Sequence, residues 1–567
     1  MPKIMRTQSA RLPHRLPSRS LSVPTTRRNL DVYSIYSTSR KTVILICVFL
    51  SVVAVYSTYR YIQNNIAEGN RSLKYKRVPV GLASSIHCTL VDEPDKWTSR
   101  TCVFTNALIH EGQIIVFAPE GTTADLMVQE FKRPTSGVGR TDSLPPTAKA
   151  TPLHRFLRKQ GKKNRFVVNV NAGYPPDEGT SNLKIHVKRY GDDLPEYPNF
   201  PPVDSTAVMF NPNWPENVGH YLFDDIFASF DAVASVGLSP YSIHLVKLAS
   251  CQDMYLGFFK EMWKGKSQYK RCHKFYSNWT NTLVGTDVII SSTLAPQTPA
   301  DMDSDPNADM PEAFTKPVNG AKALFFKKVV VGISRTNVRL LGNRNESWMI
   351  FRHNVLLRLG LLRYDKWNLN PEEKREVLSD MVAKGEVKLK KGDGSDRRTL
   401  MVVLEKVEGK HARQILNYQK CVDAIAGMDE IGTLVTMAPA GQSLRTQVLL
   451  YVLADTVFSA PGGITMFSGF LRRNALALYP DHYDPLIGSY HLEPVWDEMS
   501  HFVYQDIPIE WKDLRYHDIT MFQKLSMSQT EVVRDWTNLV LDLDVLESKL
   551  LEGLAQARIR RQGFKKK

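Results

Sequence analysis

A glycine pair after an apolar run is the feature of this sequence best suited to hold a phosphate group. Residues 459–467 read SAPGGITMF, in which a buried strand is predicted to end at Pro461 and a helix to follow. Gly462 and Gly463 let the backbone approach a ligand closely, and the N–H groups at the start of a helix attract anions. The turn therefore predicts a diphosphate site, with an ordinary tight turn as the alternative.

Basic residues after an earlier apolar run could supply the positive charge that a diphosphate needs. The strand predicted over residues 401–405 would bring Lys406 to the same edge of the sheet, and Arg413 follows at the start of the next predicted helix. A guanidinium can bind a phosphate through two parallel hydrogen bonds. We interpret Lys406 and Arg413 as candidate phosphate ligands, although a solvated basic helix start would explain them equally well.

A histidine and a carboxylate at helical spacing form the third candidate. His220 lies in the opening turn of the helix predicted over residues 217–235, and Asp224 lies four residues later on the same face. A histidine held by a carboxylate can act as a general base on a substrate hydroxyl. The alternative is a histidine that caps or packs locally.

Two groups of aspartates resemble metal ligands without the context that a metal site needs. Asp301, Asp303 and Asp305 lie in a loop rich in Pro and Asp, whereas an Asp-x-Asp metal site should follow a buried strand. Asp542 and Asp544 lie in a stretch that reads as helix. We therefore predict no metal site.

Alternating strands and helices are expected to position the first two candidates. In the C-terminal part this alternation has short connections, which is typical of a parallel, doubly wound sheet. The predicted strands there are 399–406, 433–439, 456–461 and 475–480, and the predicted helices are 410–427, 443–454 and 463–473. Upstream apolar runs predict further strands at 113–118, 166–170, 207–211, 243–249 and 288–292. Two more helices are expected at 346–363 and 529–557.

The N-terminus reads as a basic tail followed by a membrane anchor. Residues 42–57 contain no charged side chain, and with the flanking tyrosines the segment 42–61 is long enough to cross a thin bilayer. The predicted topology is a single-pass type II membrane protein, with residues 1–41 as a disordered cytosolic tail and 62–80 as a stem. The folded part would lie in the lumen of the Golgi apparatus or the endoplasmic reticulum.

The net charge of +15 does not indicate nucleic-acid binding. Residues 1–41 contribute a net +8 and residues 557–567 a net +6, so the remainder carries about +1. A nucleic-acid-binding domain needs a basic face on its folded part. The two basic ends therefore account for the excess.

Cysteines and glycosylation sequons agree with a lumenal location. In an oxidising compartment, Cys88 could pair with Cys102 and Cys251 with Cys272, which leaves Cys421 unpaired and Cys47 in the anchor. Sequons occur at Asn70, Asn278 and Asn345.

Four blocks, taken in their order along the chain, resemble glycosyltransferase family 61, which includes plant xylosyl- and arabinosyltransferases and animal N-acetylglucosaminyltransferases. The blocks resemble the family's Arg-x-Cys-x-Phe-x-Asn segment, its Asn-x-x-His helix start, its Arg with a following Asn, and its Gln-bearing helix before a glycine turn. They cover residues 97–117, 217–230, 402–425 and 443–467. The chain departs from the family at Pro461, where histidine is usual, and it lacks an acidic residue just before Pro480.

The resemblance implies an α/β fold of the GT-B type, with two Rossmann-like domains that face a cleft, behind the transmembrane helix. The domains would be an acceptor domain over 81–340 and a donor domain over 341–520, with a C-terminal helix and basic tail over 521–567. The resemblance implies inverting, metal-independent transfer without a cofactor. The sugar would be of xylose, N-acetylglucosamine or arabinose type, and would pass from a UDP-sugar to a glycan or glycoprotein acceptor.

Residues carried over by the resemblance fall into two groups. His220, Asp224 and Asp225 would face the acceptor. The donor side would comprise Lys406, Arg413, Ser443, Gln447, Ser459, Gly462 and Gly463. Two alternatives remain open, a GDP-sugar-using enzyme similar to fucosyltransferases and a non-catalytic lumenal binding protein of the same fold.

Overall fold

The computed structural model divides the chain into two compact units, Met1–Leu73 and Lys74–Lys567, and all described elements belong to the second. The structure describes residues 75–78, 81–93, 98–121, 125–130, 149–159, 165–168, 170, 182–197, 203–212, 217–241, 243–248, 279–284, 289–290, 295–296, 323–333, 345–366, 369–394, 398–406, 414–480, 501–509, 513–516 and 537–565. The predicted tail and the predicted anchor over 42–61 lie outside these residues. The end of the predicted stem forms strand β1 (Tyr75–Arg77), which pairs with β9 (Asp193–Tyr197).

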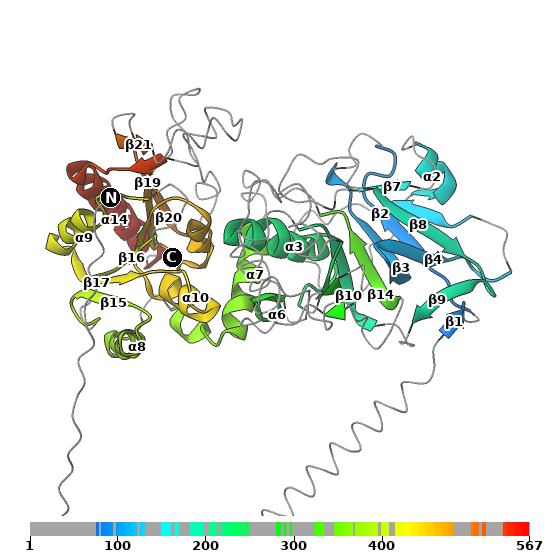
Figure 1. The fold of residues 1–567 in the computed structure, drawn as a ribbon, viewed down its shortest axis with the longest axis horizontal. Coiled ribbons are helices and arrows are strands. Elements are labelled where there is room, and N and C mark those ends of the chain that lie inside the picture. The colour runs from blue at the N-terminus through cyan, green and yellow to red at the C-terminus, as the bar shows by residue number, and fades with distance from the viewer. Residues whose placement is uncertain are drawn as a thin grey trace, which may run out of the picture. The chain divides into compact units, whose positions relative to one another are not determined.

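Among the described residues, the C-terminal sheet has six strands in the order β15-β17-β16-β18-β19-β20 (Figure 1). All neighbouring pairs are parallel except β15 with β17, which places an antiparallel strand at one edge. The strands are β15 (Lys388–Lys391), β16 (Thr399–Leu404), β17 (Ile431–Met437), β18 (Thr456–Ser459), β19 (Leu476–Pro480) and β20 (Val503–Ile507). The chain passes from β16 to β17 and then returns to the other side of β16, so the strand order reverses there. Such reversal points are where open α/β sheets bind ligands.

Helices cover both faces of this sheet, because successive strand residues point to opposite sides. Met401 and Val403 pack in one cluster with side chains of α9 (Tyr418–Gly427) and α14 (Leu543–Lys565). Val402 and Leu404 pack in another with α10 (Leu444–Leu453). The near-continuous burial of β16 and β17 agrees with a parallel sheet covered on both sides.

The N-terminal sheet is mixed and, in the part of the chain that the structure describes, has twelve strands. Its centre is parallel, in the order β14-β10-β11-β12, and β3 then joins β14 in the antiparallel sense. The central strands are β10 (Val203–Phe210), β11 (Ile243–Lys247), β12 (Ile289–Ile290) and β14 (Leu324–Val331). The strands that extend it are β2 (Ser85–Cys88), β3 (Cys102–His110), β4 (Gln113–Phe117), β5 (Met127–Glu130), β6 (Lys149–Pro152), β7 (Arg165–Val167), β8 (Asn182–Lys188) and β13 (Ala295–Pro296).

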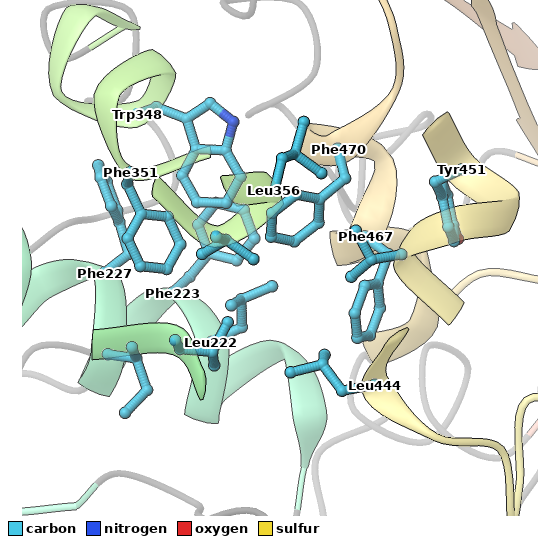
Figure 2. Close-up of a cluster of buried hydrophobic side chains, with 14 of the residues drawn as sticks. Leu222, Phe223, Phe227, Trp348, Phe351, Leu356, Leu444, Tyr451, Phe467 and Phe470 are labelled. Atoms are coloured by element: carbon cyan, nitrogen blue, oxygen red, sulfur yellow. The ribbon is translucent and has the colours of Figure 1, made fainter. Parts of the chain in front are cut away.

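One hydrophobic cluster includes side chains from both sheets, such as Val208 and Val330 of the first and Val402 and Val457 of the second. Helical segments fill the space between them, and Figure 2 shows their aromatic side chains converging. These segments are η2 (His220–Phe227), α3 (Ala228–Ser235), α6 (Thr280–Val284), α7 (Asn345–Arg358), α10 and η8 (Gly463–Phe470). The Trp348 ring stacks on Phe223 at 4.8 Å. The core is therefore continuous from one sheet to the other.

The prediction of a GT-B fold, with two Rossmann-like domains behind a transmembrane helix, is wrong as a whole. The described structure is α/β with mixed sheets, and the antiparallel pairing of β3 with β14 makes the first sheet different from a simple Rossmann-like domain. Within the described ranges, no helix combines the length and the apolar character that crossing a membrane requires, and the predicted span over 42–61 lies outside those ranges. We therefore describe the fold only as α/β with mixed sheets.

Several predicted helices have different bounds or types. The helix expected over 529–557 begins at Leu543, because Asp542 caps it by accepting hydrogen bonds from two following N–H groups. It is preceded by β22 (Thr537–Leu539), which pairs with β21 (Leu514–Tyr516). The helix expected over 346–363 ends at Arg358, where Gly360 adopts a positive φ of 68°. The helix expected after the glycine pair is a 3₁₀-helix.

The predicted disulfide between Cys88 and Cys102 is confirmed, and it joins the facing ends of β2 and β3. Cys421 is free and buried, as predicted. The predicted pair Cys251 and Cys272 lies outside the described residues. Of the sequons, Asn70 and Asn278 also lie outside them, and Asn345 begins α7.

Candidate functional site

The carboxyl ends of β16 and β18 lie side by side, because Leu404 is paired with Ser459 in the parallel ladder. The segments that leave these two strands therefore start next to each other at the point where the strand order reverses. One carries Lys406, and the other carries Gly462 and Gly463. The structure thus brings two of the predicted donor-side segments to one edge of the sheet.

The glycine pair packs against another segment of the same chain, residues 217–219. Gly462 has a φ of 143°, which favours glycine, and its carbonyl accepts hydrogen bonds from the N–H and the hydroxyl of Thr465. A Cβ on Gly463 would overlap the side-chain oxygen of Asn217 and would lie 3.2 Å from the nitrogen of Gly219. A Cβ on Gly219 would lie 2.8 Å from Cγ of Met466. Gly219 and Gly463 are thus both needed for their two segments, which are far apart in sequence, to meet.

Asn217 connects the glycine turn to the predicted histidine. Its Oδ1 accepts a hydrogen bond of 2.9 Å from the N–H of Gly219, and its carbonyl accepts one from the N–H of Tyr221. These bonds fix the chain at the start of η2, one residue before His220. The contact with Gly463 therefore places His220 close to the carboxyl edge of the C-terminal sheet.

His220 and Asp224 form the predicted pair. The Nδ1 of His220 and an oxygen of Asp224 are 2.6 Å apart. Asp224 is 6% exposed at its side chain, whereas His220 is 34% exposed. Because a carboxylate only accepts, we assign the proton in this hydrogen bond to Nδ1 of His220. The pair lies in a π-helix, a rare form that is frequent at functional sites.

Asp225, the residue after Asp224, lies in the interior. The residue is fully buried. The burial of Tyr221 raises the pKa of that tyrosine, and the charge of Asp225 raises it further. The Tyr221 hydroxyl is 2.9 Å from that of Thr280. Asp225 is thus buried near Tyr221, and its role toward an acceptor stays a prediction.

Three of the remaining predicted donor-side residues form hydrogen bonds within the fold. Ser443 caps α10 by accepting a hydrogen bond from the N–H of Thr446, as expected for an N-cap. Gln447 is buried and donates to the carbonyl of Gln442. Ser459 is buried and donates to the carbonyl of Ala460. Lys406 is half-buried, and Arg413 lies outside the described residues.

Other residues of the resembling blocks also have structural partners. Arg100 is buried and donates to the carbonyls of Leu90 and Glu93. The amide of Asn417 donates to the carbonyl of Leu541 and accepts from its N–H. These two hydrogen bonds fix the chain just before α9. They explain why the helix predicted from residue 410 begins only at Tyr418.

The sequence reading missed the side chains of α7 that hold the far end of η8. Trp348 donates to the carbonyl of Gly469, and Arg352 donates to the carbonyls of Phe470 and Leu471. Arg352 also forms a two-pronged ion pair with Asp365, at 2.5 and 2.7 Å. Trp348 and Arg352 are four positions apart and therefore share one face of the helix. That spacing could have indicated the two residues from the sequence.

The sequence reading also missed Tyr418. Its hydroxyl is buried without a hydrogen-bond partner among the described residues. Burial raises the pKa of Tyr418, and the charge of Glu405, at the end of β16, adds to this effect. Tyr418 is therefore near the carboxyl edge of the sheet, where a ligand could satisfy its hydroxyl.

Two comparisons with known proteins found no relative of this chain. No family model matches the chain, and no curated protein matches it either.

Proposed function

We propose that this protein is a glycosyltransferase that moves a sugar from a UDP-sugar to a glycan or glycoprotein acceptor. The observation that supports this most is the contact between the glycine turn and the helix start that carries His220. It brings a candidate phosphate-binding turn and a candidate general base together from segments more than 200 residues apart. The family resemblance of the same two segments gives the reaction class.

On the donor side, the diphosphate would lie at the carboxyl ends of β16 and β18. Lys406 and Arg413 would supply positive charge, and the N–H groups that follow Gly462 would supply hydrogen bonds. We propose that the transfer needs no metal, so these groups would stabilise the diphosphate as it leaves. Ser443, Gln447 and Ser459 would act indirectly, since each already bonds within the fold.

On the acceptor side, His220 would be the general base. Its Nε2 would take the proton of an acceptor hydroxyl while Nδ1 keeps its bond to Asp224. The hydroxyl oxygen would attack the anomeric carbon from the face opposite the diphosphate. The bond from that carbon to the diphosphate oxygen breaks, and its electron pair leaves with the UDP. One displacement of this kind inverts the anomeric configuration.

The compartment we propose is the lumen of the Golgi apparatus or the endoplasmic reticulum. Support comes from the disulfide between Cys88 and Cys102, because such bonds persist in oxidising compartments. Enzymatic removal of N-linked glycans from the protein isolated from its native cells should lower its apparent mass if the sequons are used.

The test is a panel of UDP- and GDP-sugars with the purified full chain. We expect turnover with a UDP-sugar, and we expect His220→Ala to lower kcat by about 10²- to 10⁴-fold with donor affinity unchanged. His154→Ala, at a distant exposed position, is the matched control. Arg413→Ala should instead weaken donor binding.

The other outcomes decide between the alternatives. Turnover with GDP-sugars alone would support the GDP-sugar enzyme. Binding without turnover for every donor and acceptor would support a non-catalytic binding protein. Full activity of His220→Ala would exclude His220 as the base.

A further inference from the structure

Helix α14 has an exposed apolar stripe on the side that points away from the sheet. Its other side packs on β19, β20 and α9 (Figure 1). The buried residues of that packing side recur every three or four positions, namely Leu546, Leu550, Leu554 and Ala557. Leu551 is 42% exposed, Ile559 is 68% exposed, and Ala555 between them is also exposed. Because these three residues are four positions apart, they form one stripe along the helix.

The stripe has the composition of a surface that another helix covers. Among the described residues, Ile559 is the most exposed of the large hydrophobic side chains. A second aliphatic side chain on the same stripe makes it more than a single exposed residue, and contiguous apolar surface marks interaction sites. The small side chain of Ala555, at the centre of the stripe, lets a second helix approach closely. The stripe therefore suits a helical partner.

The charges of α14 differ between its two halves. The first half, residues 543–554, contains Asp544, Glu547, Glu552 and one lysine, Lys549. Lys549 is 2.8 Å from Glu552, and such an exposed pair contributes little. The second half, residues 555–565, contains no acidic residue, and its basic residues are Arg558, Arg560, Arg561 and Lys565. Two antiparallel copies of α14 bring each acidic half against the basic half of the other copy, whereas parallel copies bring like charges together. The charges therefore favour a second copy of this chain, in antiparallel orientation.

A single register satisfies both the stripe and the charges. When Ala555 lies opposite Ala555 of the second copy, Leu551 of each copy faces Ile559 of the other. Glu552 then faces Arg558, because these two residues lie equally far before and after Ala555. Each contact occurs twice, as an interface with two-fold symmetry requires.

The C-terminal end of α14 is fixed at the edge of the sheet where the parallel strands begin, the amino edge. Arg561 donates to the carbonyl of Asn474 and lies 3.7 Å from Asp455. Asp455 directly precedes β18, is buried, and also forms ion pairs with Lys374, at 3.3 Å, and with Arg472. The candidate donor site lies at the opposite ends of the same strands. A partner on the exposed side of α14 therefore leaves that site open.

We propose that two copies of this chain associate through α14, with the helices antiparallel about a two-fold axis that passes near Ala555. Leu551 and Ile559 supply the apolar contacts, and Glu552 and Arg558 supply the charge pairs. A single helix pair is at the low end of specific interfaces, so we expect a weak dimer with a Kd of about 10 µM. The association does not depend on the proposed activity.

Sedimentation of the purified full chain in a mild detergent, over about 1–100 µM, measures the dimer. We expect a shift from monomer to dimer as the concentration rises. Ile559→Glu places a carboxylate opposite Leu551 and should raise the Kd more than about tenfold. Leu357→Glu is the matched control and should keep the wild-type Kd, because Leu357 is 58% exposed and belongs to α7. A wild type that stays monomeric, or an unchanged Kd in Ile559→Glu, would overturn the proposal.

A charge exchange tests the antiparallel register. Glu552→Arg and Arg558→Glu should each weaken the association about 3- to 10-fold, because each places like charges opposite one another. The double variant should recover most of the wild-type affinity, since the exchanged pair again carries opposite charges. The two positions do not face each other within one helix, so the recovery must come from contacts between copies. Additive losses in the double variant would contradict the register.

Engineered cysteines locate the two-fold axis. Under copper–phenanthroline oxidation, Ala555→Cys should form a disulfide between copies, above the background of the wild-type cysteines. Ser548 and Gln562 are exposed and lie equally far before and after Ala555. Ser548→Cys or Gln562→Cys alone is about 21 Å from its own counterpart and should form no link, whereas a mixture of the two variants should link. Self-linking of Ser548→Cys, or no link in Ala555→Cys, would overturn the antiparallel arrangement.

Discussion

The two edges of the C-terminal sheet hold polar groups in different ways. At the amino edge, three hydrogen bonds with backbone groups and ion pairs with three cations hold Asp455 in the interior. At the carboxyl edge, the glycine turn presents backbone groups, and His220 remains about one third exposed. Burial at the first edge fastens strands and helices together, whereas partial exposure at the second leaves a group able to exchange a proton. Substitutions at the two edges should therefore separate stability from activity.

Asp455→Asn should have the largest effect on stability. The change removes the one carboxylate among three cations, and losing one partner of a buried ion pair costs about 3–5 kcal/mol. Denaturant unfolding would measure this loss. At a temperature where the variant is folded, its kcat should equal that of the wild type. A variant that is fully stable but inactive would reverse the roles that we assign to the two edges.

Gly463→Ala tests the carboxyl edge. The new Cβ overlaps the side-chain oxygen of Asn217, so we expect about 1–3 kcal/mol of destabilisation and a larger proportional loss of activity. Gly427→Ala is the control, because a Cβ there meets nothing within 4 Å. Removing the obstacle in the double variant Asn217→Ala with Gly463→Ala should recover part of the stability. Purely additive losses would show that the two residues are not coupled.

His501 gives the C-terminal domain a pH-dependent stability. Burial lowers the pKa of His501 to about 3, with the charge of Arg352 adding to it. Between about pH 6.5 and about pH 3 the unfolded chain binds a proton at this histidine that the folded protein does not bind. The free energy of unfolding should therefore fall as the pH falls through this range, by up to about 1.4 kcal/mol per pH unit.

The variant His501→Gln should show a shallower pH dependence than the wild type over the same range. Urea unfolding at a series of pH values would measure both slopes. Parallel curves for the two proteins would show that other groups cause the acid sensitivity.

Ser443→Ala should have the smallest effect. Loss of the helix cap should cost about 1 kcal/mol, with donor affinity unchanged, because the hydroxyl is bonded to Thr446. Thr446 is also 3.2 Å from Glu386, so the local network keeps one anchor. Weaker UDP-sugar binding by this variant, measured by calorimetry, would make Ser443 a direct donor ligand.

Four strands of the C-terminal sheet, β16 to β19, could be predicted from the sequence, whereas its strands β15 and β20 and much of the N-terminal sheet could not. Runs such as residues 399–404 are buried on both sides, so nearly every residue is apolar. Strand β14 was missed because Lys327 and Lys328 interrupt its apolar pattern. Its pairing with β3 joins segments more than 200 residues apart, and no local pattern records such a pairing.

The candidate site shows the same division. The position of the helix at His220 and its pairing with Asp224 follow from helical spacing, and the structure has both. The contact of Gly463 with Asn217 does not follow from any local spacing, because it depends on how two segments that are distant in sequence pack. The helix types were also missed, since a π-helix and a 3₁₀-helix carry the same apolar spacing as an α-helix over one or two turns.

The shared aromatic core has a consequence for how the protein is made. Phe223 and Phe227 pack against Trp348, which in turn contacts Phe470 (Figure 2). Roughly 240 residues separate the first of these aromatics from the last, and a ribosome needs on the order of 10–50 s to add them. During that interval the aromatic face that Phe470 covers in the folded protein lacks this cover. Newly made chains should therefore depend on chaperones until residue 470 has emerged, and chains that end before it should aggregate or be degraded.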